Sequence, residues 1–332
     1  MNRWLAIIAG LLAALALLAL VSLALGQVTI PIGEVWAALT GTPENDLMGT
    51  IVVDLRLPRL ILALLVGAQL AISGAILQGV TRNALASPDL VGVTAGAGFV
   101  AVILVLVIPE APRALVPIAA LAGGAVSGAI VYLIAWKNGV SPERLALTGI
   151  AVTAIFQAGV TAIVTLSVEN NNVQLALQWL TGSLYGRSWD DLWLLLPWSF
   201  VGITAALFIS HKVNVLLLGD HVAAGLGMRI ERARIGLVAI AVALAASAVS
   251  ITGTVAFIGL VIPHLVRLLV GADHRLVIPL SAIAGAALFL VADDIARTVI
   301  PSLEIPAGLL TALIGAPYFI FLIMRSKTRI SV

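Results

Sequence analysis

Few residues of this sequence have side chains that could do chemistry, and their spacing predicts no catalytic site. Cysteine is absent, which excludes disulfides, thiolate catalysis and thiolate metal ligands. The four histidines are far apart and form no ligand pattern: His211, His221, His264 and His274. No phosphate-binding G-x-x-x-x-G-K-[ST] loop, no H-E-x-x-H and no G-x-S-x-G is present. We therefore expect no enzyme activity, no bound metal and no ATP site on this chain.

Two arginines at the start of an apolar segment could recognise a partner. Arg56 and Arg59 stand directly before the apolar residues 60–80, separated by a leucine and a proline. Arginine presents a rigid fork of donors that matches a carboxylate. The pair is therefore either a docking site for a carboxylate-bearing partner or a pair of side chains that reach out to the membrane surface. The sequence leaves both interpretations open.

A polar segment, residues 211–234, interrupts the apolar pattern and is too polar to cross a membrane. Asp220 is a typical N-cap for a short helix over 221–226, and a glycine directly after this range is a typical helix stop. Leu226 and Met228 would then be exposed. Exposed apolar residues of this kind often mark an interaction site, so we expect this segment to contact a partner protein.

Uncharged polar residues line one face of the apolar segment 145–168. They recur every fourth position, as Thr153, Gln157, Thr161 and Thr165. Residues four apart share one face of a helix. This face either forms hydrogen bonds to a neighbouring helix or lines a weakly polar pathway. Small residues with the same spacing predict close helix packing instead: Gly67, Ala71, Ala75, Gly79, Gly124 and Gly128.

The elements that carry these residues are membrane-spanning helices. Of the 332 residues, 61% are hydrophobic and 10% are charged, and the mean hydropathy is +1.15. These values exclude a soluble enzyme, a disordered chain and a nucleic-acid-binding protein. Ten apolar segments are spaced as spans: 4–25, 60–80, 90–108, 114–136, 145–168, 192–210, 235–255, 257–270, 276–297 and 307–324. The first is longer than a signal-peptide core, so we expect it to remain as a helix, and 257–270 predicts a partial helix after a tight break.

The distribution of charge predicts the orientation in the membrane. With both termini in the cytoplasm and ten spans, thirteen of the 18 basic residues lie inside and five lie outside. Of the 16 acidic residues, five lie inside and eleven outside. This asymmetry obeys the positive-inside rule. Two segments then lie outside: a long connection, residues 26–59, and an amphipathic segment, residues 169–191, which is either a structural anchor or a lid.

Several stretches resemble one family of transporters over residues 55–320. They are RLPR at 56–59, GAQLAISGAILQG at 67–79, LASPDL at 85–90, LALTG at 145–149, WLTGS at 179–183, FIGLVIPHLVR at 257–267 and EIPAG at 304–308. In these residues the chain resembles the FecCD-type permeases of ATP-binding-cassette (ABC) importers, which take up ferric siderophores, haem and cobalamin. One departure is Ala84, where the family usually has proline.

The resemblance implies an all-α, type II ABC importer permease fold, with residues 1–332 as a single transmembrane domain. It also implies partners: a second permease subunit (an identical copy or a paralogue), two cytoplasmic ATPase subunits that carry ATP and magnesium, and an extracytoplasmic substrate-binding protein. The substrate would be an iron chelate, with cobalamin or haem as the alternative. The location would be the bacterial cytoplasmic (inner) membrane.

The resemblance also assigns roles to residues of this sequence. ATPase coupling falls on Gly219, Asp220, His221, Ala223, Ala224, Leu226, Gly227 and Met228. Docking of the binding protein falls on Arg56, Arg59 and Arg297. The cytoplasmic gate falls on Asn83, Leu85, Ser141 and Pro142. The path lining falls on Thr153, Gln157, Thr161 and Thr165.

Functions of other classes fit the sequence less well. A membrane enzyme needs ionisable groups gathered at one depth, and none are found. An ion-coupled secondary carrier needs acidic residues at mid-depth, whereas Asp293 and Asp294 lie near the end of a span.

Overall fold

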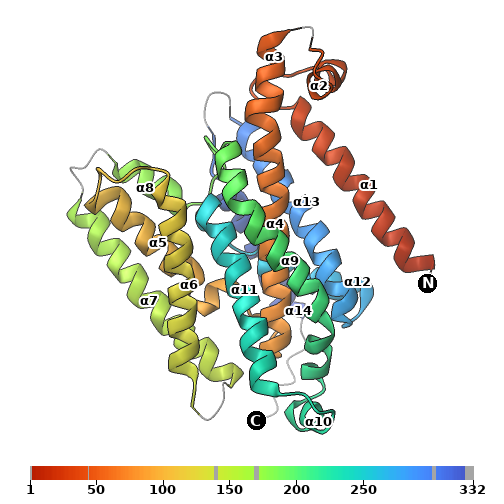
Figure 1. Cartoon of the computed structure of the whole chain (residues 1–332), viewed down its shortest axis with the longest axis vertical. Helices are drawn as coiled ribbons and strands as arrows, with labels where there is room; N and C mark the ends of the chain where they lie inside the picture. Colours follow the sequence, from red (N-terminus) through yellow and green to blue (C-terminus); the bar gives the residue numbers. More distant parts are fainter. Residues whose placement is uncertain (1, 44, 138–140, 168–171, 301–303, 326–332) are drawn as a thin grey trace.

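The computed structural model describes residues 2–43, 45–137, 141–167, 172–300 and 304–325, and its regular elements within these ranges are all helical (Figure 1). The longer helices are α1 (Asn2–Ala24), α4 (Leu57–Thr81), α5 (Val93–Val102), α6 (Leu115–Ala135), α7 (Pro142–Leu166), α9 (Trp189–Leu217), α11 (Ile230–Thr252), α12 (Ile258–Val270), α13 (His274–Thr298) and α14 (Ala307–Arg325). Short helices connect them: α2 (Ile32–Leu39), α3 (Asp46–Thr50), α8 (Val173–Leu180) and α10 (Asp220–Gly225).

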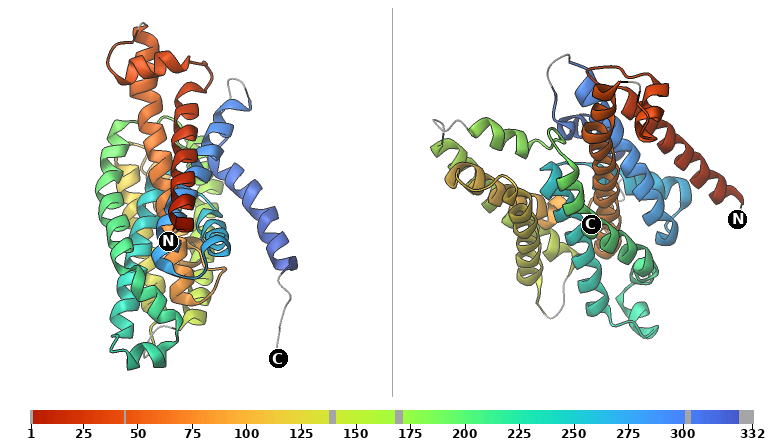
Figure 2. Two further views of the ribbon diagram at one scale, coloured as in Figure 1. Left: turned by 90° about the vertical axis from the view of Figure 1, so that its right-hand side faces the viewer. Right: turned by 45° about the horizontal axis from the view of Figure 1, so that its top comes forward.

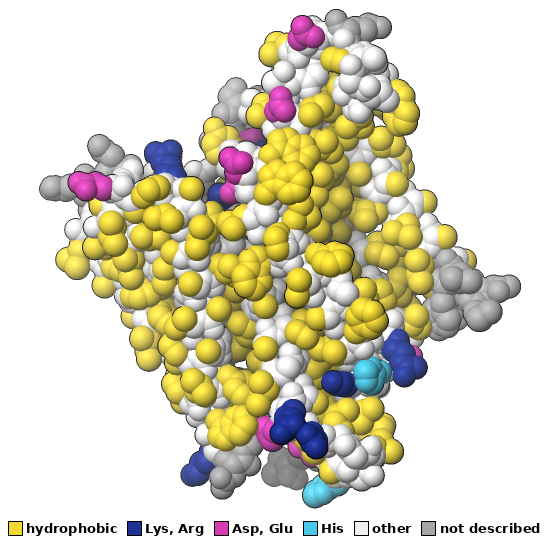
Figure 3. Space-filling model, viewed as in Figure 1, with side chains coloured by type: hydrophobic (Ala, Val, Ile, Leu, Met, Phe, Trp, Pro, Cys, Tyr) yellow, Lys and Arg dark blue, Asp and Glu magenta, His cyan; other side chains and the backbone are white. Residues whose placement is uncertain are grey.

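The expected spans are present. Within the described ranges, seven helices are long and apolar enough to cross a membrane, and three shorter apolar helices stand at the remaining expected positions: Val93–Val107, Ile258–Val270 and Ala307–Phe321. Hydrophobic side chains cover the middle of the molecule, while most charged side chains lie toward its two ends (Figure 3). The predicted all-α, polytopic membrane fold is confirmed.

The second span begins earlier than predicted. A π-helical turn, Ile51–Arg56, joins α3 to α4, so one continuous helix runs from Asp46 to Thr81 over 36 residues. Pro58 does not interrupt it, because the π-helical turn changes the hydrogen-bond pairing and the first turn of α4 tolerates a missing N–H. Arg56 and Arg59 consequently lie on this helix and not in a loop.

The helix α9 also extends beyond its predicted end. It contains 29 residues and therefore measures about 43 Å, which exceeds a hydrocarbon core of about 30 Å. A capping box of Ser188 and Asp191 fixes its start. The first residues of the predicted polar segment, 211–217, belong to this helix, so the connection to α11 is only residues 218–229.

The helix α4 runs through the centre of the bundle, among α9, α11, α12 and α13 (Figure 1). Its small residues permit this packing, as predicted. A Cβ atom on Gly67 would lie 2.3 Å from the carbonyl oxygen of Gly285, and one on Gly74 would lie 1.9 Å from that of Gly259. Side chains at these positions would push the helices apart.

The helices α5, α6, α7 and α8 form a second group beside this centre (Figure 2). Gly128 brings α6 against Val242 of α11, where an added Cβ would lie 2.8 Å from that side chain. On the other side, α1 packs mainly on α13. Figure 2 also shows α14 diverging from the bundle toward the C-terminus.

The predicted break before α12 is confirmed. The helix α11 ends at Thr252, and Gly253 and Phe257 both have positive φ angles (76° and 71°). Gly253 is required here, because a Cβ atom would lie 1.8 Å from the carbonyl oxygen of Trp179. The break therefore ties the start of α12 to the end of α8.

Candidate functional site

The helix α10 projects from one end of the bundle, opposite α2 and α3 (Figure 1). It spans Asp220–Gly225 and stands between Gly219 (φ 101°) and Gly227 (φ 79°). The predicted N-cap is wrong by one position: Gly219 is the N-cap and Asp220 is the first helical residue. The carboxylate of Asp220 makes no capping bond because arginines of other helices bind it.

Asp220 joins three helices through ion pairs. Its carboxylate pairs with Arg82, the left-handed C-cap of α4, and with Arg234 of α11, whose Nη2 lies 3.2 Å from both carboxylate oxygens. Arg82 also donates from Nε to the carbonyl of Leu216 over 3.0 Å. Partial burial favours the neutral carboxyl, but the two arginines outweigh it and lower the pKa of Asp220. The projecting helix is thereby fixed to the end of α4.

The exposed face of α10 carries apolar side chains. Leu226 is 65% exposed and Val222 is 49% exposed, whereas Ala223 is buried against the bundle. His221, Ala224, Gly225 and Gly227 are exposed as well. The expectation for Met228 is wrong: it is half-buried and packs on the core, because its N–H donates back to the carbonyl of Ala223 over 3.0 Å.

The segment between α4 and α5 has the expected turn. The side-chain oxygen of Asn83 accepts the N–H of Leu85 over 2.9 Å. Pro88 holds Ser87 extended (φ −140°, ψ 164°) and starts a short 3-10 helix over Pro88–Val91. Leu85 is 47% exposed, while the neighbouring Ala86 is buried. Leu85 therefore leaves an apolar side chain unpacked within its own chain.

Ser141 and Pro142 start α7. The Oγ of Ser141 accepts the N–H of Arg144 over 3.2 Å, which makes it an N-cap, and Pro142 occupies the first turn. The side chain of Pro142 lies outside the described residues. Both residues thus have a capping function, and their role in a gate stays a prediction.

The polar face of α7 is open. Gln157, Thr161 and Thr165 are exposed, and only Thr153 is half-buried, with its Oγ1 3.4 Å from the carbonyl oxygen of Asp89. Thr161 donates to the carbonyl of Gln157 within the same helix, over 2.9 Å. In the most apolar stretch of α7, only 11% of the residues are buried inside the chain. In the corresponding stretch of the helix that contains α4, 83% of the residues are buried. Within the described residues, interhelical hydrogen bonds therefore account for Thr153 but not for Gln157, Thr161 and Thr165.

Arg59 is not free to meet a partner. Its Nε and Nη2 donate to the two carboxylate oxygens of Asp293 over 2.8 and 2.9 Å, and its Nη1 donates to both oxygens of Glu304 over 3.1 and 3.0 Å. The side chain is only 13% exposed. Two carboxylates of the same chain therefore occupy its donors in this conformation, and the docking role of Arg59 stays a prediction.

Arg56 and Arg297 are also buried. Arg56 donates from Nη1 to the carbonyls of Leu23 and Ala24 over 2.7 and 3.0 Å. Arg297 donates to Asp294 over 2.6 Å and to the hydroxyl of Ser22 over 2.9 Å. All three arginines therefore cross-link α1, α4 and α13 at the end of the bundle opposite α10, which the charge distribution predicts to lie outside and which we call the outer end.

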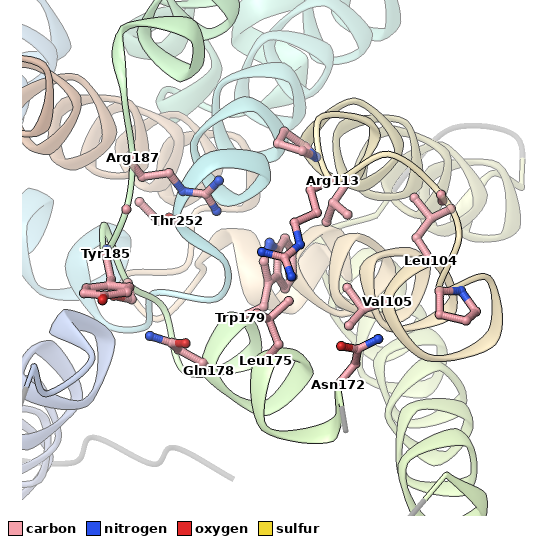
Figure 4. A pocket seen from close by; sticks show the side chains of 16 residues that line it. Leu104, Val105, Arg113, Asn172, Leu175, Gln178, Trp179, Tyr185, Arg187 and Thr252 are labelled. Carbon is pink, nitrogen blue, oxygen red and sulfur yellow. The ribbon is translucent and has the colours of Figure 1, made fainter. Parts of the chain in front are cut away.

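The outer end contains a pocket of about 480 Å³ between α8, α6 and the residues before α9 (Figure 4). Arg113 and Arg187 point into it above the indole of Trp179. Spacing in the sequence could not identify this pocket, because its residues come from segments that only the fold brings together. The Asp220 ion pairs escaped prediction for the same reason. In the part of the chain that the structure describes, no group of three or more His, Asp or Glu side chains could hold a metal.

Comparisons with known proteins agree with this architecture. The sequence profile of the FecCD transport family matches residues 14–325. The chain is 42% identical to the Fe(3+)-citrate import system permease protein YfmE of Bacillus subtilis, over 94% of this chain and 95% of that protein. It is 40% identical to the Fe(3+) dicitrate transport system permease protein FecD of Escherichia coli, over 95% and 96%. It is also 40% identical to the cobalamin import system permease protein BtuC of Halobacterium salinarum, over 90% and 81%.

A solved structure shares the fold as well. An inward-facing metal-chelate type ABC transporter superposes with a TM-score of 0.87 at 31% identity, covering 96% of this chain and 99% of the other. Together with the ten apolar helices, the projecting α10 and the match over 14–325, this establishes that the chain belongs to the FecCD transport family.

Proposed function

We propose that this chain is the membrane-spanning permease subunit of an ABC importer that moves a ferric siderophore or ferric citrate complex across the bacterial cytoplasmic membrane. The observation that carries the proposal is its identity of 40–42% with iron–citrate permeases over nearly their whole length. The chain itself performs no chemical reaction and binds no ATP. Both termini and α10 would be cytoplasmic.

A second permease subunit would complete the path. The exposed face of α7 carries Gln157, Thr161 and Thr165, which would be unfavourable against lipid tails. A second subunit facing α7 would give these side chains a water-filled passage between the two copies. A bulky polar chelate needs such weakly polar walls, because strong binding groups would retain it.

Two ATPase subunits would act through α10. The exposed Leu226 and Val222 fit a cleft on a partner, and the ion pairs of Asp220 connect α10 to Arg82. Arg82 directly precedes Asn83 and the turn that carries Leu85. A movement of α10 would therefore be transmitted to the proposed gate through the ion pair between Asp220 and Arg82.

A substrate-binding protein would dock on the outer end. This surface would be held in place by the three arginines that fix α1, α4 and α13: Arg56, Arg59 and Arg297. Arg59 could bind a carboxylate of the partner only if its ion pair with Asp293 or Glu304 opened. An ion-coupled carrier is disfavoured, because arginines neutralise both Asp293 and Asp294.

Uptake measurements test the function. A strain that lacks this gene should lose uptake of one ⁵⁵Fe-labelled chelate, and the plasmid-borne gene should restore it. Ferric citrate, a ferric hydroxamate and labelled cobalamin should be compared in parallel. If only cobalamin uptake were lost, the transported substrate would be cobalamin and not an iron chelate. Unchanged uptake of all three compounds would overturn the proposal.

A further inference from the structure

The pocket at the outer end is a polar–apolar cavity that the proposed path does not use. Its volume of about 480 Å³ lies within the range of about 300–1,000 Å³ of small-molecule sites. Leu104, Val105, Val116 and Leu175 form an apolar wall. No acidic side chain lines it among the residues described.

Two polar groups of the pocket lack an acceptor. The indole of Trp179 is 9% exposed, and its Nε1 has no hydrogen-bond partner within the described structure. The same holds for Nε of Arg187, although its Nη1 pairs with Asp191 over 3.1 Å. Both nitrogen atoms lie just beneath the pocket surface, and a buried donor without an acceptor is unfavourable, so a small shift of the wall that brings them to the acceptor oxygens of a ligand would be stabilising.

The charge of the pocket selects the ligand. Arg113 is exposed, forms no ion pair within the described part of the chain, and points toward the same space as Arg187 (Figure 4). Arg113 without an ion pair, Arg187 beside its pair with Asp191, and an indole N–H at an apolar wall match a carboxylate group on a compact molecule. The outer surface as a whole is net acidic, with eleven acidic and five basic residues expected there, so this cationic pocket is a local exception.

The pocket is also connected to helices next to the proposed path. Ser183, which follows α8, donates its N–H to the carbonyl of Thr252 in the pocket wall over 2.7 Å. The neighbouring Gly182 accepts the N–H of Gly308, at the start of α14, over 2.9 Å. A ligand in the pocket would therefore affect the positions of the break between α11 and α12 and of the start of α14.

We propose that Arg113, Arg187 and the indole N–H of Trp179 form an outer binding site for the free carboxylates of the ferric chelate, occupied before the chelate enters the path. The inference rests on the proposed import of a ferric chelate and deepens it by selecting carboxylate-bearing chelates. An acidic side chain of the binding protein offers the same chemistry, but it would leave most of the apolar wall uncovered.

Equilibrium dialysis of the purified full-length chain in lipid nanodiscs, with ⁵⁵Fe-citrate and without the binding protein, tests the site. The wild type should bind saturably. Arg113→Gln should weaken binding by roughly tenfold, since a hydrogen bond to a charged group is lost. Trp179→Phe should weaken it by about threefold, because only one hydrogen bond is removed. Arg275→Gln, an exposed arginine at the α10 end, is the matched control.

The outcomes separate the possibilities. A neutral ferric trihydroxamate should bind the wild type and Arg113→Gln equally. Equal binding of ferric citrate by all variants would overturn the site. Normal chelate binding with lost docking of the binding protein in Arg113→Gln would assign the pocket to a protein carboxylate and also overturn it. The proposed function fails separately, if the gene deletion leaves uptake of every ferric chelate unchanged.

Discussion

At the scale of single residues, the arginines of the outer end have two distinct environments. Arg59 donates four hydrogen bonds to Asp293 and Glu304, and its side chain is almost fully buried. Arg113 is exposed and directed into a pocket. The same side-chain type thus cross-links helices at one position and is available to a ligand at the other. Burial, and not the sequence context, makes the difference.

Replacing Arg59 tests its structural role. Arg59→Gln leaves the buried carboxylates of Asp293 and Glu304 without a counter-charge, which should destabilise the chain by about 3 kcal/mol. Thermal unfolding of the purified protein in detergent would show a lower midpoint for Arg59→Gln and an unchanged midpoint for Arg113→Gln. Equal midpoints for both variants would show that the ion pairs of Arg59 contribute little to stability.

At the scale of elements, α10 combines a fixed side with an open side. Ion pairs from Asp220 attach its first turn to α4 and α11, and Ala223 is buried below it. Its last residues and Leu226 remain uncovered. A short helix held by its start can transmit force through the ion pairs, so its exposed apolar side chain is the expected contact with an ATPase.

A charge on this side chain tests the contact. In Leu226→Asp, binding of the ATPase would bury an unpaired carboxylate, so co-purification of the ATPase should fall by about tenfold or more. Leu47→Asp is the matched control, because Leu47 is 68% exposed at the opposite end, against 65% for Leu226. Both variants should insert into the membrane normally. Undiminished co-purification and chelate-stimulated ATP hydrolysis in Leu226→Asp would refute the contact.

At the scale of the whole molecule, one chain leaves a transport path incomplete. The helix α4 is enclosed, but α7 exposes its polar face and α14 exposes Leu309, Leu313 and Phe321. Leu85 is likewise exposed, with 47% of its surface accessible. A second subunit that covers these surfaces would place two Leu85 side chains near the common axis, where they would form a narrow apolar constriction.

A cysteine at position 85 tests this arrangement, since the chain has no other cysteine. If the importer contains two copies of this chain, Leu85→Cys should cross-link them in the resting state and less so when the ATPases are trapped with nucleotide. Leu47→Cys should not cross-link in either state. With a paralogous partner, the second cysteine belongs at the equivalent position of that chain. A yield that nucleotide does not change would leave Leu85 without a gating role.

The sequence by itself determined the membrane class, the positions of the ten apolar helices and the projecting helix, because hydropathy and turn residues act locally along the chain. The family was recognised from the resemblance of its motifs and not from these patterns. The close passage of Gly67 against Gly285 also followed from small-residue spacing, whereas that of Gly74 against Gly259 lay outside the predicted stripe. Only the tertiary structure decided that Arg59 is saturated by Asp293 and Glu304, that Asp220 binds Arg82 and Arg234, and that Arg113 and Arg187 share a pocket. The physical reason is that ion pairs and cavities depend on distances between residues far apart in sequence, and no local pattern encodes these distances.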